Sequence, residues 1–502
     1  MRSLASPDEM RRADEATISA GTPPEILMER AGAAVAAAVK TVVGGVYDRR
    51  CVVVCGTGNN GGDGFAAARI LAEAGMAVRC TVVGETERIR GAADIHLERC
   101  RAAGVVIAPF SPDRLARADV IVDALLGTGA SGAPRSDAAQ AIDAINASDA
   151  PVVAADLPSG IDGATGAAAG AAVRATVTVA MGSEKTGTAV GVGAEHAGSV
   201  TVAPIGIRVG RTAGVAADPK DVADVLPSRD RATNKFGSGS VLVIAGSDRM
   251  PGAAALAARG AARAGAGYVM LGSTRTVCNI VVARAPEVVA TVAADTPELG
   301  PEAIGRLAGA FERASVVALG PGLGRGASQD ALVEAALGGI PVPLVLDADG
   351  LNALAAKPEA AAKRHDPLIL TPHAGELARL LGWDSVSITD DPIGAVREAV
   401  ERFGCTVLLK GPSTIVGTPD HTVVVRAGGP ELASAGTGDV LTGVIAALVA
   451  AGTSSTEAAW AGAWLHGRAG AIARASFGPR GVVAWDVAEA LPAAEALVKR
   501  RG

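Results

Sequence analysis

The chain has few aromatic residues: Phe, Trp and Tyr make up 2% of its 502 residues, although 49% are hydrophobic. Together with 64 glycines, this composition favours alanine-rich helices packed on valine- and isoleucine-rich strands joined by tight turns. The length exceeds what one hydrophobic core accommodates, so we expect more than one domain. The composition is typical of an α/β protein.

Clustered cysteines and clustered positive charge are also missing. The six cysteines include no C-x-x-C pair and no cysteine-histidine spacing of a zinc site. Cys51 and Cys55 flank three valines and are predicted to be buried strand residues. The net charge is −6, and no basic stripe with interleaved aromatic residues is present. Nucleic acid is therefore not an expected partner.

Long hydrophobic segments are absent as well. The longest uncharged run, residues 440–456, is short for a membrane span and contains Thr442, Gly443 and Ser454. The first twelve residues are charged and lack the apolar stretch of a signal peptide. We expect a soluble cytoplasmic protein without membrane contacts.

Short apolar runs that end in Gly or Asp recur along the chain, as at residues 50–58 and 119–129. Most precede alanine-rich segments with helical spacing, as at residues 65–75. This alternation predicts mostly parallel sheets covered by helices on both faces. In such sheets ligands bind beyond the carboxyl ends of the strands, where these Gly, Asp and Ser clusters fall.

The alternation of strands and helices lapses between residues 207 and 235, where small, polar and charged residues dominate. We place a domain boundary near residues 210–220 and expect domains at 1–212 and 220–502. The two halves are not obvious repeats, and each carries its own strand-end motifs. Two sites are therefore expected.

The first of these motifs, GTGNNGGDGF, holds a G-x-G-x-x-G pattern but also Asp63. A carboxylate about 4 Å from a phosphate charge costs roughly 4 kcal/mol at an effective dielectric near 20, so a bare phosphate cradle is disfavoured. Two further strand ends add Asp123, Asp156 and Ser159, whose oxygens suit a hard cation. The motifs predict a cation-stabilised substrate pocket. Alternatively, Asp63 caps a helix and the other two aspartates are turn residues.

Three segments in order, GTGNNGGDGFAAAR, VDALLGTGASG and ADLPSGIDG, resemble the NAD(P)H-hydrate epimerase family over roughly residues 1–210. The resemblance implies a Rossmann-like domain in which Asn60, Asp123 and Ser159 hold K⁺. Asp156 is the hypothetical acid/base residue, and the resemblance leaves open whether the C6 hydroxyl is lost and regained or the ring opens. The implied substrate contacts are Asn59, Asn60, Gly61, Gly62, Asp63, Gly127, Thr128, Gly129, Ala130, Ser131, Gly132, Ala133 and Asp156.

Lys185 follows in a loop-like Gly/Thr context and is expected to be solvated rather than functional. The surrounding residues 180–198 are poor in bulky side chains, which puts their contact with substrate in doubt.

In the second half, the segment ASAGTGDVLTG begins with small residues and continues as a helix. Gly436, Thr437 and Gly438 place free backbone N–H groups at the helix N-terminus, an anion site. Asp439 is then best explained as a base that faces an attacking hydroxyl. Lys410, after another strand, is expected to contact nucleotide phosphates.

These features resemble the ribokinase-like superfamily. The set GPGLG, LDADGLNAL, TPHAGELARLLG, KGPSTIV and SAGTGDVLTG resembles more narrowly the ADP/ATP-dependent NAD(P)H-hydrate dehydratases, over roughly residues 220–500. The resemblance implies contacts of Ala253, Gly322, His373 and Asp439 with the hydrated cofactor. It implies nucleotide contacts at Lys410, Gly411, Pro412, Ser413, Thr414 and Gly438. Mg²⁺ is expected on the phosphates of ADP or ATP, with its protein ligands left open.

For some of these residues, a structural role is the alternative to a catalytic or binding role. Asp349 is interpreted as a helix cap, and His373 has a buried structural role as its alternative. Trp460, Trp464 and His466 lie in an alanine-rich helical pattern and are predicted to be core or interface residues.

The combined prediction is a bifunctional enzyme that epimerises R and S hydrates of NADH and NADPH and then dehydrates the S form, with ADP favoured by family analogy alone. One alternative is a ribokinase-like vitamin or sugar kinase with a non-catalytic N-terminal binding domain. A homo-oligomer is expected.

Overall fold

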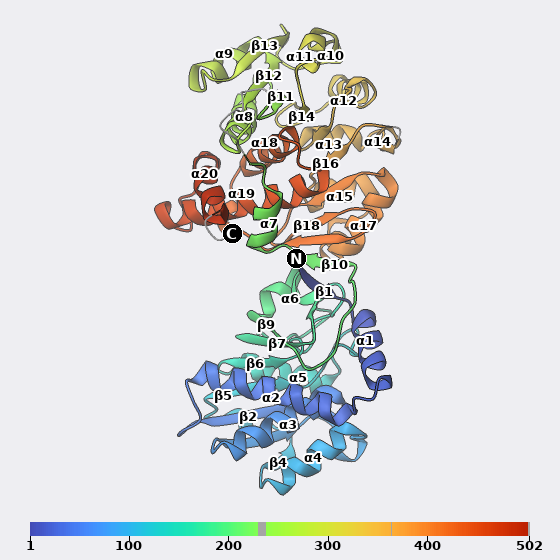
Figure 1. Cartoon of the computed structure of the whole chain (residues 1–502), viewed down its shortest axis with the longest axis vertical. Helices are drawn as coiled ribbons and strands as arrows, with labels where there is room; N and C mark the ends of the chain where they lie inside the picture. Colours follow the sequence, from blue (N-terminus) through green and yellow to red (C-terminus); the bar gives the residue numbers. More distant parts are fainter. Residues whose placement is uncertain (229–236, 363, 500–502) are drawn as a thin grey trace. The chain divides into compact units, whose positions relative to one another are not determined.

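The computed structural model describes residues 1–228, 237–362 and 364–499. The chain divides into two compact units: Ser3–Gly214, here the N-terminal unit, and Val215–Gly502 with Met1–Arg2, here the C-terminal unit (Figure 1). Among the described residues, no helix combines the length and the apolar character that crossing a bilayer requires.

The N-terminal unit is built around a seven-stranded sheet in the order β4-β3-β2-β5-β6-β7-β9, with neighbouring strands parallel. The chain moves outward from β2 in one direction and then from β5 in the other, so β2 and β5 flank a topological switch point. The strands of this sheet are β2 (Arg50–Cys55), β3 (Ala77–Val82), β4 (Val106–Pro109), β5 (Val120–Ala124), β6 (Val152–Ala155), β7 (Val177–Met181) and β9 (Ser199–Ala203). Outside it, β1 (Arg2–Ala5) pairs with β8 (Glu184–Lys185) in parallel. The α-helices are α1 (Pro7–Ser19), α2 (Pro24–Val43), α3 (Asn59–Glu73), α4 (Ala92–Ala102), α5 (Ser136–Asn146) and α6 (Gly191–His196).

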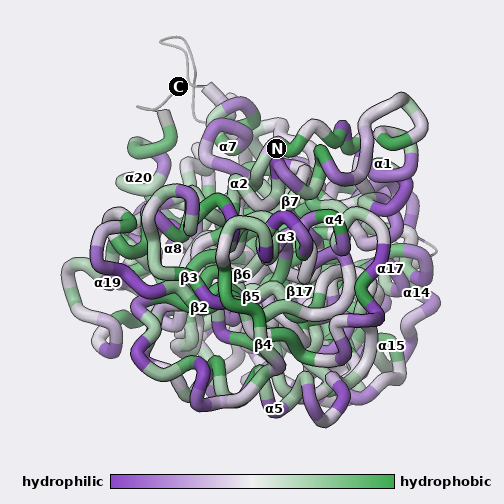
Figure 2. The backbone as a smooth tube through the Cα atoms, turned by 90° about the horizontal axis from the view of Figure 1, so that it is seen from below, coloured by the Kyte–Doolittle hydropathy of each residue, from purple (hydrophilic) through white to green (hydrophobic). Residues whose placement is uncertain are grey.

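Both faces of this sheet are buried, which explains the continuous apolar runs of its strands. In β2, Val53 packs in a core with α2, α3 and α4, whereas Val52 and Val54 pack in a second core with α5. The hydrophobic colour along β2 and β5 in Figure 2 follows this arrangement. Cys51 and Cys55 are buried free thiols, as predicted.

The C-terminal unit has a sheet with the parallel order β13-β12-β11-β14-β15-β16-β17, extended by the antiparallel strands β18 and β19. Its strands are β10 (Gly214–Ala216), β11 (Ser240–Ile244), β12 (Tyr268–Thr274), β13 (Val289–Ala294), β14 (Val316–Leu319), β15 (Leu344–Leu346), β16 (Leu368–Leu370), β17 (Thr406–Leu409), β18 (Thr414–Gly417) and β19 (Thr422–Val425). Its α-helices are α7 (Pro219–Val225), α8 (Pro251–Arg263), α9 (Arg275–Arg284), α10 (Glu302–Arg306), α11 (Ala308–Phe311), α12 (Ala327–Gly339), α13 (Asp349–Leu354), α14 (Glu359–Ala362), α15 (Ala374–Leu381), α16 (Ser385–Asp390), α17 (Pro392–Phe403), α18 (Thr437–Ala450), α19 (Ser455–Phe477) and α20 (Ala484–Lys499).

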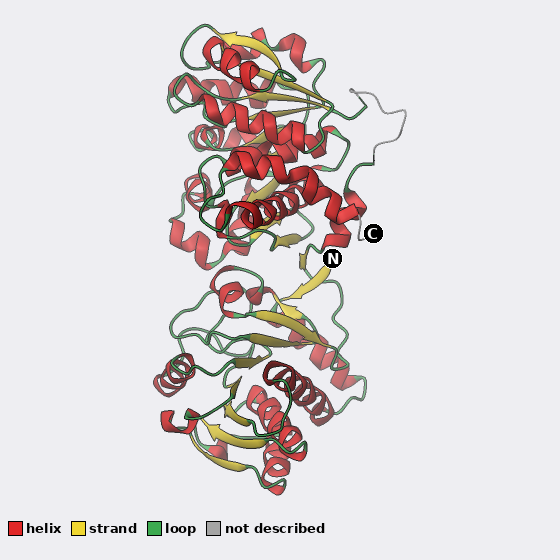
Figure 3. Ribbon diagram, turned by 90° about the vertical axis from the view of Figure 1, so that its left-hand side faces the viewer, coloured by secondary structure: helices red, strands yellow, loops and turns green. Residues whose placement is uncertain are grey.

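This sheet winds outward from β11 and then from β14, so both units share one winding order although their sequences show no obvious repeat. Helices cover each sheet (Figure 3). Trp460 and Trp464 of α19 belong to the buried core beside α8, α18 and α20, in agreement with the predicted core position. The predicted α/β architecture is confirmed.

Candidate active sites

The turn between β2 and α3 lies at the switch point of the N-terminal unit. A Cβ atom on Gly61 would lie 2.0 Å from the carbonyl oxygen of Gly56, and one on Gly56 would lie 2.0 Å from that of Leu125. These glycines therefore allow backbone segments to approach closely. Asp63 lies in the second turn of α3, whose N-cap residue is Gly58, so the alternative that Asp63 caps this helix is wrong.

Asn60, Asp123 and Ser159 are joined by hydrogen bonds at this switch point. Ser159 Oγ donates to Asp123 Oδ1 at 2.6 Å, and its backbone N–H donates to Oδ2 at 2.8 Å. The Leu126 peptide links the rest: its N–H donates to Ser159 Oγ at 2.8 Å, and its carbonyl accepts from Asn60 Nδ2 at 2.9 Å. The structure thus brings together, near the ends of three strands, the three residues that were predicted to bind one cation.

Among the described residues, Asp123 has hydrogen-bond partners but no ion-pair partner. Asp123 is fully buried, and burial raises the pKa of its carboxyl to about 6. Asn60 Oδ1 is buried and has no hydrogen-bond partner among the described residues. Because a buried polar atom without a partner costs free energy, an orphaned oxygen beside a buried carboxyl fits a hard cation such as K⁺.

Asp156 forms an ion pair with Lys185, which corrects the expectation that Lys185 is solvated. The Lys185 side chain is 1% exposed, and its Nζ donates to Asp156 Oδ1. Asp156 has a positive φ of 71°, a conformation that is uncommon outside glycine and that clusters at functional sites. Residues 183–188 around Lys185 are largely buried, so the poverty of bulky residues there reflects close packing.

Two further carboxyl groups interact electrostatically with this pair. Burial raises the pKa of Asp63 well above its usual value, and the nearby charge of Asp156 adds to the effect. Burial also raises the pKa of Asp14 in α1. Sequence reasoning missed Asp14, because nothing in the local pattern of α1 distinguishes it from other helix-surface acids.

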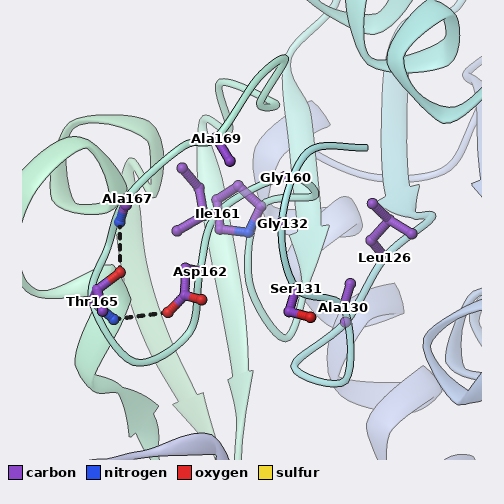
Figure 4. Close-up of a pocket in the computed structure, with 12 residues that line it drawn as sticks. Leu126, Ala130, Ser131, Gly132, Gly160, Ile161, Asp162, Thr165, Ala167 and Ala169 are labelled. Carbon is purple, nitrogen blue, oxygen red and sulfur yellow. Dashed lines mark hydrogen bonds between the residues drawn. The ribbon is translucent and has the colours of Figure 1, made fainter. Parts of the chain in front are cut away.

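The predicted substrate loop, residues 127–133, follows β5, and four of its residues line a cavity of about 210 Å³: Gly127, Ala130, Ser131 and Gly132. Figure 4 shows Ala130, Ser131 and Gly132 on one side, with Ile161 and Asp162 on the other. Residues 129–133 are exposed. This loop is therefore accessible to a ligand beside the hydrogen-bonded cluster.

In the C-terminal unit, α18 begins in the GTGD segment as predicted. Its N-cap residue, Gly436, has a φ of 90°, and Asp439 lies in the first turn. Burial, together with the negative charge of Asp347, raises the pKa of Asp439 to about 7. A carboxyl that titrates near neutral pH suits a general base.

Lys410 follows β17, and its side chain lies beside two acidic residues that also raise the pKa of Asp439. Its Nζ donates to Asp347 Oδ1 at 2.7 Å and lies 3.9 Å from Glu376 Oε2. Asp347 Oδ2 accepts a hydrogen bond from Thr442 Oγ1 of α18 at 2.6 Å. Sequence reasoning missed Asp347, although its position directly after the apolar strand β15 was a usable signal.

The remaining nucleotide-site candidates are arranged around Lys410 and α18. A Cβ atom on Gly438 would lie 3.5 Å from Lys410 Nζ, so these two residues are neighbours. Gly411, Pro412 and Ser413 form the short turn from β17 to β18, and Thr414 begins β18. Gly411 and Pro412 are exposed.

His373 is not buried, so the alternative of a buried structural histidine is wrong. Its side chain is 54% exposed, and Nδ1 accepts hydrogen bonds from the backbone N–H groups of Gly375 and Glu376 at the start of α15. Lys410 N–H donates to the Pro372 carbonyl at 2.8 Å, which holds His373 beside the Lys410 strand end. His373 thus caps a helix while exposing its ring.

Ala253 and Gly322 meet at the switch point of this sheet, after β11 and β14. A Cβ atom on Gly322 would lie 2.8 Å from that of Ala253, and Gly322 has a φ of 65°. These two predicted contacts with the hydrated cofactor are therefore neighbours in space.

Asp349 does not cap α13, contrary to the prediction. The N-cap residue is Ala348, with φ 52° and ψ −121°. Asp349 instead accepts a hydrogen bond from the Gly324 N–H at 3.0 Å. The strained turn at Ala348 directs the two flanking aspartates to different partners.

Comparison with known proteins identifies the family. Residues 24–187 match the model described as YjeF-related protein N-terminus, and residues 241–493 match NAD(P)H-hydrate dehydratase. A bifunctional NAD(P)H-hydrate repair enzyme of Moorella thermoacetica is 37% identical over 94% of this chain and 92% of its own. The chain belongs to the bifunctional NAD(P)H-hydrate repair enzymes. Another family member, from Mycobacterium leprae, is 38% identical over 93% of each chain.

A solved structure supports the fold of the C-terminal unit of this repair enzyme. A ribokinase-like superfamily protein of Enterococcus faecalis V583 aligns with a TM-score of 0.50 and 20% identity, over 58% of this chain and 98% of its own. The predicted family and ribokinase-like fold are thus confirmed.

Proposed function

We propose that this chain repairs hydrated NADH and NADPH: the N-terminal unit interconverts the R and S hydrates, and the C-terminal unit dehydrates the S hydrate. Family membership over nearly the whole chain supports both activities. The observation that carries the dehydratase proposal is the position of Asp439, in the first turn of a glycine-capped helix beside Lys410, where burial raises its pKa to about 7.

The C-terminal unit has the parts for nucleotide-dependent dehydration. Hydroxide is a poor leaving group, so the C6 hydroxyl is first phosphorylated: its oxygen forms a bond to phosphorus as the nucleotide's bridging P–O bond breaks. Asp439 accepts the hydroxyl proton, and phosphate then leaves with the C6–O electron pair while C5 loses a proton and the ring double bond forms. The backbone N–H groups of α18 and the Lys410 ammonium stabilise the charge on the transferred group.

ADP or ATP with Mg²⁺ is the proposed co-substrate. Lys410, the turn 411–414 and Gly438 would bind its phosphates and nucleoside. Glu376 and Asp347 lie beside Lys410, and carboxylate oxygens suit Mg²⁺, which also keeps waters and phosphate oxygens as ligands. Ala253, Gly322 and His373 would contact the hydrated nicotinamide nucleotide.

In the N-terminal unit, Asp156 is the proposed acid/base group for the proton that moves when the C6 configuration inverts. K⁺, held by Asn60, Asp123 and Ser159, would supply positive charge for substrate oxygens. The orphaned Asn60 Oδ1 and the buried Asp123 support this assignment. The proposed substrate contacts are those predicted from the sequence at 59–63 and 127–133.

The test follows the return of dihydronicotinamide absorbance from a mixture of R and S hydrates with Mg²⁺ and either ADP or ATP. Wild type should convert both epimers completely. Asp439→Asn should convert neither, whereas Asp156→Asn should convert the S form quickly and the R form at the spontaneous rate. A stable phosphorylated product without NADH would contradict the dehydratase and favour a small-molecule kinase.

A homo-oligomer and a cytoplasmic location stay predictions from the sequence.

A further inference from the structure

Lys185 is a buried cation whose hydrogen-bonding capacity is fully used. Its Nζ donates to Asp156 Oδ1, to the Met181 carbonyl at 2.9 Å and to the Ser183 carbonyl at 3.2 Å. An ammonium group has three N–H donors, so each has an acceptor. Burying such a charge is costly unless it is paired, and the pair here is Asp156. The arrangement ties the side chain of β8 to the strand end of β6.

The ion pair involves only one of the two carboxylate oxygens of Asp156. Oδ1 accepts from Lys185 and from the Met181 N–H at 3.1 Å, whereas Oδ2 has no hydrogen bond to a described residue. The Asp156 side chain is 13% exposed, compared with 1% for Lys185. The Asp156 side chain is therefore partly exposed, whereas the Lys185 side chain is buried.

The Lys185 ammonium also offsets negative charge from neighbouring acids. Asp14 of α1 and Asp63 of α3 both interact electrostatically with Asp156 and with Lys185. Without the ammonium, three carboxyl groups would share one partly buried region, and like charges disfavour ionisation.

We propose that Lys185 is a positioning residue of the epimerase: its ammonium holds Oδ1 of Asp156 in place, so that Oδ2 is presented to the substrate proton. This inference rests on the proposed epimerase function of the N-terminal unit. Lys185 itself does not contact the substrate, because its side chain is buried.

The test compares wild type, Lys185→Met and the control Lys40→Met as full chains. Lys40 is the other lysine of the N-terminal unit and lies in α2. Lys40→Met therefore makes the same substitution at a position outside the Asp156–Lys185 pair. The readout is kcat and KM for R-to-S conversion of purified R hydrate. Lys185→Met should lower kcat about 100-fold with KM nearly unchanged, because acid/base catalysis contributes at least that factor.

The double variant Asp156→Asn/Lys185→Met keeps the inference testable if Lys185→Met is unstable. A charge coupling predicts that the melting temperature falls in each single variant and partly recovers in the double variant, while epimerisation stays lost. Wild-type kcat and KM in Lys185→Met would overturn the inference, as would purely additive losses of stability. Failure of wild type itself to epimerise would instead contradict the proposed function.

Discussion

Lys410 and Asp347 form an ion pair of 2.7 Å across two strand ends of the C-terminal sheet, and this pair lies beside the proposed base Asp439. The two charges act on Asp439 in opposite directions: Asp347 raises its pKa, and Lys410 lowers it. Since Asp347 also binds Thr442, the pair connects the nucleotide-site lysine to the helix that carries the base. Asp347 therefore affects the proposed base as well as the proposed nucleotide site.

Removal of the Asp347 charge should move the pH dependence of dehydration. In wild type, kcat/KM should fall as pH falls through about 7, because Asp439 must be ionised to accept a proton. In Asp347→Asn the acid limb should lie at lower pH, since a negative neighbour is lost and Lys410 is freed to attract Asp439. Initial rates of S-hydrate dehydration from pH 5 to 9 measure this shift. An acid limb at the same or higher pH would contradict the assigned coupling.

Gly438→Ala should fold normally yet lose dehydratase activity. The added Cβ has its nearest neighbour at 3.5 Å, an ordinary contact, but it occupies the space beside Lys410 Nζ where phosphate oxygens are proposed to bind. We expect a rise in nucleotide KM or a loss of kcat of at least about tenfold, with an unchanged melting temperature. Gly338→Ala, in α12 with nothing within 4 Å of the new Cβ, is the matched control. Equal activity of both variants would argue against a phosphate site here.

Potassium should stabilise the N-terminal unit through Asp123. A ligand that binds only the folded state raises stability by about 2.7 kcal/mol at 100 times its dissociation constant. Thermal unfolding at neutral pH should therefore show a higher melting temperature in KCl than in choline chloride at equal ionic strength. Asp123→Asn should abolish the difference. Identical wild-type melting in the two salts would contradict a potassium site.

Ala348→Gly should stabilise the C-terminal unit. Ala348 has φ 52° and ψ −121°, a region that suits glycine and strains residues with a Cβ. Relief of this strain should raise the free energy of unfolding by about 1 kcal/mol, or the melting temperature by roughly 2 to 4 °C. Ala335→Gly in the interior of α12 is a control of opposite sign, because glycine weakens helices. A loss of stability in Ala348→Gly would contradict the strain.

Local patterns in the sequence were sufficient for the fold class and for most of the strand-end residues. Asp123 belongs to an apolar strand segment, and Asp439 follows a glycine-rich turn. Both patterns involve only neighbouring residues, so the sequence was sufficient to predict where these aspartates lie. Asp349 was wrongly predicted to cap a helix, because an alanine at position 348 does not indicate the positive φ that the backbone adopts there. His373 was readable as a strand-end residue, but its exposure depends on the packing of α15.

The sequence by itself determined the two α/β units and their strand-end motifs, because hydrophobic periodicity and turn residues act over a few neighbours. Only the tertiary structure decided which distant side chains meet. The Asp156–Lys185 and Lys410–Asp347 pairs join residues 29 and 63 positions apart. Whether a lysine is solvated or buried against a carboxylate depends on how the sheet brings those strand ends together, and no local pattern carries that information.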